Sequence, residues 1–186
     1  MSHAAKFIRQ LEGLKEGERS QLRRLAGKPL DEALQGFDLL TGLWWPLRRE
    51  SQAAPRRETS WLLSKLYAAF PLPHVRPEDA GARPTLPRIL GRCEPSNKYG
   101  RLRFRARFDT LLCTQISALE PHLHWALSTV ADAVKRKRCA GLDWAQLLED
   151  LSIWDRGAEH RRRMDVREEW ACHYLKVTKK KGELTC

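Results

Sequence analysis

Residues 143–155 read DWAQLLEDLSIWD, and this stretch decides the class of the fold. Its apolar residues recur at the i, i+3, i+4, i+7 spacing that places side chains on one face of an α-helix. They are Trp144, Leu147, Leu148 and Leu151. Asp143 is a favoured N-cap residue, and Gln146 follows three residues later, at the position that completes a capping box. We therefore predict an amphipathic helix that begins after Asp143 and buries its tryptophan and leucines.

The same spacing of apolar residues extends outward through most of the chain, and no long alternating run indicates a β-strand. The helical stripes lie within residues 7–14, 18–26, 59–70, 104–112, 123–134 and 166–177. The tryptophans could stack on bases, but their spacing beside leucines favours core packing, most strongly for Trp144, Trp154 and Trp170 and less for Trp44 and Trp45. The predicted fold class is all-α.

One segment cannot continue a helix. Five of the ten prolines, together with Gly81, lie between Pro71 and Pro87, and proline lacks the amide donor that a helix interior requires. We therefore predict two small helical bundles joined by a Pro-rich linker. The predicted parts are an N-terminal helical domain (1–70), the linker (71–87), a C-terminal helical bundle (88–178) and a basic tail (179–186).

The composition favours a polyanionic partner. The 186 residues include 34 Lys+Arg against 23 Asp+Glu, a net charge of +11, which suits nucleic-acid phosphates or an anionic membrane surface. No run approaches the roughly 18 apolar residues that span a bilayer, and Met1 to Gln10 lacks the apolar core of a signal peptide. Five widely spaced cysteines are typical of free thiols in a reducing compartment. We expect a cytoplasmic protein with no membrane partner.

The most basic stretch alternates arginine with other residues. Arg101, Arg103, Arg105 and Arg107 flank an apolar stripe, and on a helix Arg101 lies over Arg105 and Arg103 over Arg107. Arginine binds phosphate oxygens two at a time through its planar fork of donors. The stretch holds no interleaved acid, so we predict that it binds a phosphate backbone; local ion pairs with residues such as Asp109 are the alternative.

Further basic clusters are candidates for the same role. Four consecutive cations, Lys135, Arg136, Lys137 and Arg138, stand at a predicted helix end, where one or two would suffice to offset the helix dipole. A third cluster, partly balanced by nearby acids, comprises Arg161, Arg162 and Arg163. In the first half of the chain the arginines are spread over loops and helix ends rather than gathered in one run; they are Arg23, Arg24, Arg48, Arg49, Arg56 and Arg57. The candidates among them are Arg23, Arg24 and Arg57.

The sequence gives little support for catalysis. His122 and His124 stand two residues apart without a neighbouring cysteine or carboxylate pair, a spacing that matches no common metal site. The chain contains no G-x-x-x-x-G-K-[ST] phosphate loop and no G-x-S-x-G nucleophile elbow. We expect no metal, no cofactor, no small-molecule substrate and no enzymatic activity.

The block at residues 143–155, followed by a basic run and by Trp170 to Tyr174, resembles the C-terminal pattern of the CasB family. The step from Arg107-Phe108 to Leu111-Leu112 resembles the basic helix of that family, and residues 86–91 resemble the segment before it. Residues 14–25 resemble its N-terminal helix pair. The sequence departs from the family in its long Pro71 to Pro87 segment and its lysine-rich tail from Lys176.

CasB proteins are the small subunits of the type I-E CRISPR surveillance complex, Cascade, so the resemblance implies a two-part helical protein without enzymatic activity. Its partners would be the backbone and large subunits of Cascade, a second copy of itself, and guide RNA and target DNA within the complex. Its basic face would stabilise the target and displaced strands of an R-loop. The matched basic residues are Arg23, Arg24, Arg103 and Arg107, with Arg57 and Arg161 to Arg163 by looser alignment.

Two other classes of function remain open at this point. Residues 123–138, the turn at 139–142 and residues 143–154 have the order of a helix-turn-helix regulator, although the second helix has no Arg or Lys with which to read bases. A nuclease using Glu168, Glu169 and His173 is a more distant alternative.

Overall fold

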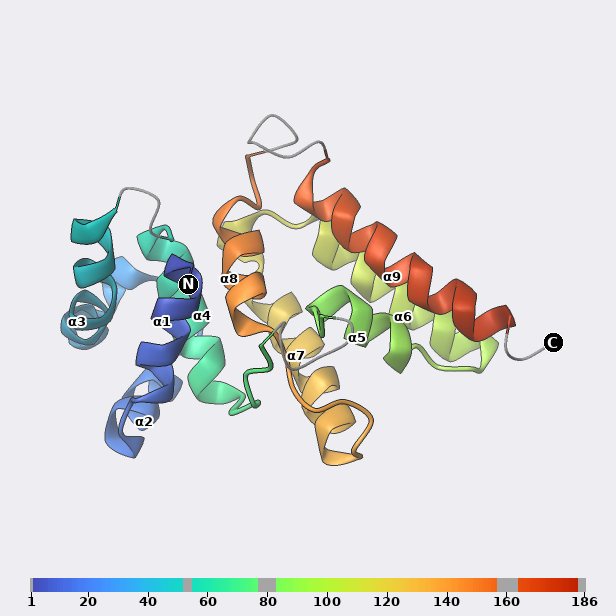
Figure 1. The fold of residues 1–186 in the computed structure, drawn as a ribbon, viewed down its shortest axis with the longest axis horizontal. Helices are drawn as coiled ribbons and strands as arrows, with labels where there is room; N and C mark the ends of the chain where they lie inside the picture. Colours follow the sequence, from blue (N-terminus) through green and yellow to red (C-terminus); the bar gives the residue numbers. More distant parts are fainter. Residues whose placement is uncertain (1, 52–54, 77–82, 157–163, 184–186) are drawn as a thin grey trace. The chain divides into compact units, whose positions relative to one another are not determined.

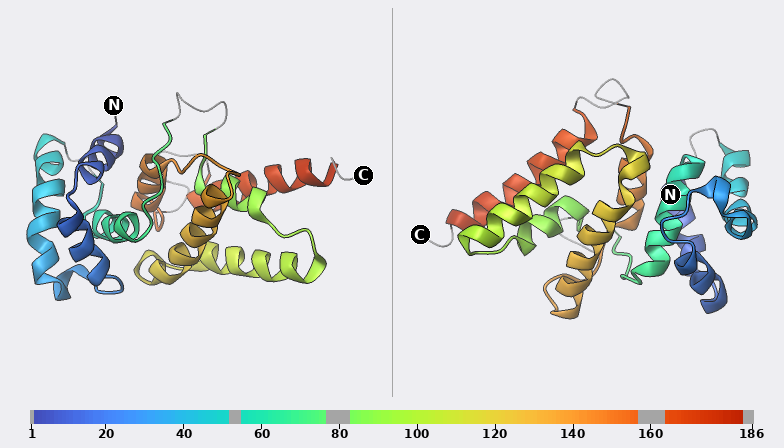
Figure 2. Two further views of the ribbon diagram at one scale, coloured as in Figure 1. Left: turned by 90° about the horizontal axis from the view of Figure 1, so that it is seen from below. Right: turned by 180° about the vertical axis from the view of Figure 1, so that it is seen from behind.

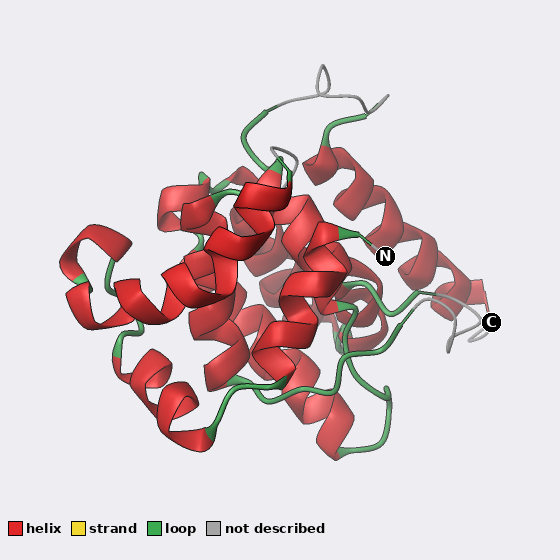
Figure 3. Cartoon of the chain, turned by 60° about the vertical axis from the view of Figure 1, so that its left-hand side comes forward, coloured by secondary structure: helices red, strands yellow, loops and turns green. Residues whose placement is uncertain are grey.

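The computed structural model describes residues 2–51, 55–76, 83–156 and 164–183 (Figure 1). These residues form nine α-helices and two short 3-10 helices and contain no strand, so the predicted all-α class is confirmed (Figure 3). The β-pairing within these ranges is a single bridge between His74 and Leu142. The chain divides into two compact units, one of residues 1–72 and 144–152 and the other of residues 73–143 and 153–186.

Helix α4 is the centre of the first unit. The unit contains α1 (His3–Glu12), α2 (Glu16–Arg24), η1 (Leu30–Glu32), α3 (Leu34–Glu50), α4 (Arg57–Ala69) and α8 (Trp144–Ser152), and α4 contacts α2, α3 and α8. Every residue from Thr59 to Ala68 is buried. Lys65 is among them, and its ammonium donates a hydrogen bond to the Lys28 carbonyl oxygen at 2.9 Å, which offsets the cost of its burial.

The second unit is built around the short helix α5. It contains α5 (Leu86–Cys93), α6 (Lys98–Cys113), η3 (Ile116–Ala118), α7 (Glu120–Lys135) and α9 (Val166–Glu183), and α5 packs against α7 and α9. Helices α6 and α9 lie side by side (Figure 1), and α7 leaves at an angle from the end of α6 (Figure 2). Phe108 of α6 stacks on Tyr174 of α9 with ring centroids 4.3 Å apart.

Tryptophans fill both cores, as the sequence predicts. Trp144 is fully buried in the first unit, where its indole N–H donates to the Leu72 carbonyl oxygen at 3.1 Å. In the second unit Trp154 and Trp170 pack edge to face, with centroids 4.9 Å apart. The Trp154 indole N–H donates to the Thr114 carbonyl oxygen at 2.9 Å. Trp144 and Trp154 are thus buried without an unpaired donor.

The division of the chain differs from the predicted domains in three places. Helix α8, expected in the C-terminal bundle, belongs to the first unit, because its apolar stripe packs against α1 and α4. Part of the expected linker belongs to the second unit, since the Leu142 N–H donates to Pro73 and the Val75 N–H donates to Leu142. The expected basic tail begins inside α9, which continues to Glu183.

A close approach between α5 and α9 requires glycine at position 91. A methyl group there would lie 2.9 Å from the Tyr174 carbonyl oxygen and 3.3 Å from the Val177 Cβ. We expect Gly91→Ala to lower the free energy of unfolding by about 1–3 kcal/mol, the usual cost of overpacking, as measured by urea denaturation. Gly17→Ala is the control, because a methyl group there meets no atom within 4 Å. Equal stability of the two variants would contradict the packing described for α5 and α9.

Candidate nucleic-acid interface

Helix α6 presents its four arginines to solvent around a buried stripe. The Asn97 side chain caps the helix by accepting a hydrogen bond from the Gly100 N–H at 2.6 Å. Phe108 and Leu111 are buried, whereas Arg101, Arg103, Arg105 and Arg107 are all exposed. Because the arginines occupy every second position, they point in different directions around the helix, and the structure gives them different partners.

Arg105 is held by a buried carboxylate. Its guanidinium contacts both carboxylate oxygens of Glu94, at 2.5 and 3.3 Å, and Glu94 is only 7% exposed. The Tyr174 hydroxyl donates to the same carboxylate at 2.8 Å. The hydrogen bond that Arg105 donates to Glu94 raises the pKa of Arg105, and burial together with Glu94 raises the pKa of Tyr174 well above its usual range. The charge of Arg105 is thus offset within the fold.

Arg103 and Arg107 form the strip of α6 that is most available to a ligand. They are one turn apart on one side of the helix, and Arg103 makes no hydrogen bond or ion pair with the described residues. The Arg107 guanidinium carbon lies 5.9 Å from the centre of the Trp125 ring on α7, within cation–π range. Arg101, on another side of the helix, donates to the Ser96 carbonyl oxygen at 2.8 Å. The four arginines of α6 therefore differ in how available they are to a ligand.

A pocket of about 310 Å³ lies beside this strip. It is lined by Arg107 and Thr110 of α6 and by His122 and Trp125 of α7. The Trp125 ring also contacts Phe104 edge to face, with centroids 5.1 Å apart. Sequence reasoning missed this pocket, although the i, i+3 spacing of His122 and Trp125 is a signal that they share a side of one helix.

The second cluster lies where α7 ends. The Lys137 N–H donates to Val134 at 2.9 Å and the Arg138 N–H donates to Ala133 at 2.8 Å, the pair of bonds that defines a Schellman motif. Lys137 has a φ of 57°, a conformation that favours glycine. All four residues from Lys135 to Arg138 are exposed, and none forms an ion pair with a residue in the described ranges. The predicted cluster is thus a solvent-exposed group of four positive charges.

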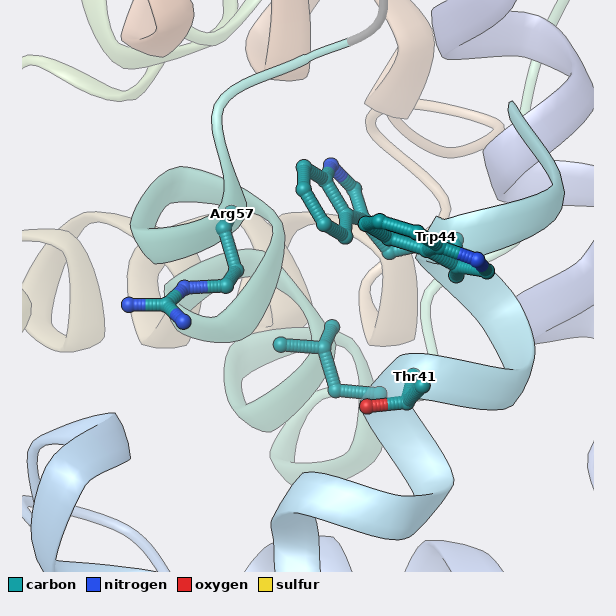
Figure 4. A pocket seen from close by; sticks show the side chains of 5 residues that line it. Thr41, Trp44 and Arg57 are labelled. Carbon is teal, nitrogen blue, oxygen red and sulfur yellow. The ribbon is translucent and has the colours of Figure 1, made fainter. Parts of the chain in front are cut away.

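The predicted cations of the first unit lie on two helices and have different surroundings. Arg23 pairs with Glu16 on its own helix, Arg24 is exposed, and Arg57 contacts Glu58 at 3.2 Å. Arg57 also lines a pocket of about 250 Å³ with Trp44 and Thr41 (Figure 4). Trp45 borders the same pocket and is half exposed. Arg161, Arg162 and Arg163 lie outside the described residues.

Comparisons with known proteins identify the family of this chain and solved structures with a similar fold. The family model described as CRISPR-associated protein Cse2 matches residues 18–174, most of the chain. The chain belongs to the Cse2 family. A solved structure with this fold carries the name CasB. The assignment therefore confirms the resemblance to the CasB family.

Two solved Cse2-type structures have this fold over their full length. The crystal structure of CasB from M. ruber superposes with a TM-score of 0.73 at 20% identity, covering 100% of this chain and 99% of that one. A CRISPR-associated Cse2-family protein from Thermus thermophilus gives a TM-score of 0.62 at 24% identity, covering 95% and 99%. No curated protein matches the sequence.

The described residues were also searched for metal sites and for membrane-spanning helices. Among the described residues of this Cse2-family chain, no group of three His, Cys, Asp or Glu side chains is arranged to hold a metal ion. Within the same ranges, no helix has both the length and the apolar character needed to cross a membrane.

The different surroundings of Arg105 and Arg103 can be tested by measuring the stability of two variants. Arg105→Ala leaves the buried Glu94 carboxylate without its cation, so we expect the free energy of unfolding to fall by about 1–3 kcal/mol. Arg103→Ala removes the same charge from the same helix but no described contact, and should change it by less than about 0.5 kcal/mol. Urea denaturation of both variants measures the difference, and equal losses would contradict the role given to Glu94.

Proposed function

We propose that this Cse2-family protein is a noncatalytic small subunit of a type I-E Cascade surveillance complex, in which its arginines and lysines bind nucleic-acid backbone and stabilise the R-loop. The observation that carries the proposal is the presence, in the second unit, of two exposed cationic groups without described ion pairs. They are the Arg103–Arg107 strip and residues 135–138. A surface of this kind, in a chain with a net charge of +11, attracts phosphates through sequence-independent contacts.

The geometry of residues 135–138 supports a role for their charge beyond ending the helix. Glycine would adopt the φ of 57° at position 137 without the steric cost of about 1–2 kcal/mol that a residue with a Cβ carries. One or two cations would also suffice to offset the helix dipole. A lysine at this position, among three other exposed cations, is consistent with contact to phosphates.

Backbone contact is the form of recognition that an RNA-guided complex requires from such a subunit. Pairing between the guide and the target strand reads the sequence, so the protein needs only to hold the opened strands. Docking onto the backbone and large subunits of Cascade, and onto a second copy, would use apolar surface. Tyr99 and Leu102 of α6, which are 75% and 58% exposed, are candidates for this purpose. Such a protein would work in the cytoplasm.

The regulator alternative receives less support. Helices α7 and α8 belong to different units, and residues 136–143 connect them, whereas a helix-turn-helix joins two packed helices through a turn of about 3–4 residues. The apolar face of α8 packs on α1 and α4. Its side chain Gln146 donates to Asp150 at 2.9 Å. Sequence-specific duplex binding by the isolated protein would nevertheless restore this alternative.

Salt dependence tests the proposed function in the assembled complex. We expect the double variant Arg103→Ala/Arg107→Ala to weaken binding of target DNA and to make the slope of log K against log salt shallower by about 1.4–1.8, because two phosphate contacts are lost. Arg9→Ala, an exposed arginine of α1 outside the predicted clusters, is the control for charge. An unchanged slope in the double variant would contradict the assignment of these arginines.

A further inference from the structure

The pocket between α6 and α7 offers more than charge. Arg107 supplies a guanidinium plane, Trp125 an indole, His122 an imidazole and Thr110 a hydroxyl. Trp125 is only partly buried, so part of its ring remains available to a ligand. Aromatic rings and guanidinium planes are the groups on which proteins stack unpaired bases.

The pocket lies at one end of the cationic strip. Arg103, Arg107 and Thr110 stand at i, i+4 and i+7 and therefore share one side of α6. A strand whose phosphates lie along Arg103 and Arg107 would reach the pocket with the next nucleotide. Bases of a duplex are stacked and paired within the helix, so turning one out toward such a pocket costs unstacking and unpairing energy that a single strand does not require.

The stacking groups are already held in place. Phe104 and Trp125 pack edge to face, with ring centroids 5.1 Å apart, and the Arg107 guanidinium lies over the Trp125 ring at 5.9 Å from its centre. The ring is thus fixed by the fold rather than ordered by the ligand, which lowers the entropy cost of binding. His122 and Thr110 can donate or accept hydrogen bonds, so they do not favour one base strongly.

We propose that this pocket holds one unpaired nucleobase of a single strand whose phosphates lie along Arg103 and Arg107. The inference rests on the proposed function and deepens it, because it assigns this site to single-stranded rather than duplex nucleic acid. The base stacks against Trp125 and Arg107, and His122 and Thr110 contact its edge.

The test compares two strands that carry the same phosphates. The full-length protein is titrated with an oligothymidine of about 12 nucleotides and with an abasic strand of equal length, at low salt. We expect the thymidine strand to bind about 5- to 150-fold more tightly, the range that corresponds to one stacked base. This comparison needs no variant, so it holds whether or not a substituted protein folds.

Two variants of Trp125 test whether the pocket is the source of the preference for the thymidine strand. Trp125→Leu keeps apolar volume but removes the aromatic face, so the thymidine strand should lose its advantage; Trp125→Phe keeps an aromatic ring and should retain most of it. Arg103→Ala should weaken both strands by the same factor. A preference that survives Trp125→Leu would place the base elsewhere and overturn the proposal.

The outcomes also separate this inference from the proposed function. Equal affinities for the two strands would overturn the base pocket while leaving backbone binding intact. Failure of both strands to bind, even at low salt, would instead contradict the proposed binding of nucleic acid and the pocket together.

Discussion

The buried carboxylate of Glu94 links helices α6 and α9 of the second unit. This side chain precedes α6 in the chain, pairs with Arg105 on α6 and accepts a hydrogen bond from Tyr174 on α9. The pair of Arg105 and Glu94 thus adds a polar link between helices beside the stacking of Phe108 on Tyr174. Arg103 and Arg107 of the same helix remain exposed.

Some positive charges of this protein are paired within the fold, and others are available to a ligand. Arg105 is neutralised by Glu94, Arg23 by Glu16, and Lys65 is buried against a carbonyl oxygen. Among the described residues of the second unit, the Arg103–Arg107 strip and residues 135–138 are exposed, and an aromatic pocket lies beside the strip. Both are suited to phosphates through their positive charge. The function proposed for this Cse2-family chain follows from that surface.

Much of the fold can be predicted from the period of the apolar residues. The stripe Trp144–Leu151 predicts both helix α8 and its buried tryptophan correctly. Periodicity shows which side of a helix is buried but not which helix covers it, so it could not place α8 in the first unit. It also could not pair Arg105 with Glu94 and Tyr174, since Tyr174 is 80 residues from Glu94 in sequence. The pocket at Trp125 depends on the angle between two helices and was missed for the same reason.

The proposal that this protein works as a subunit of an RNA-guided complex can be tested directly. The tagged protein is purified from cells that express its neighbouring genes, and the native mass and the bound RNA are determined together. We expect a large assembly that contains this chain and a uniform, repeat-derived guide RNA. A lone monomer or dimer without RNA, obtained while those neighbours are expressed, would contradict it.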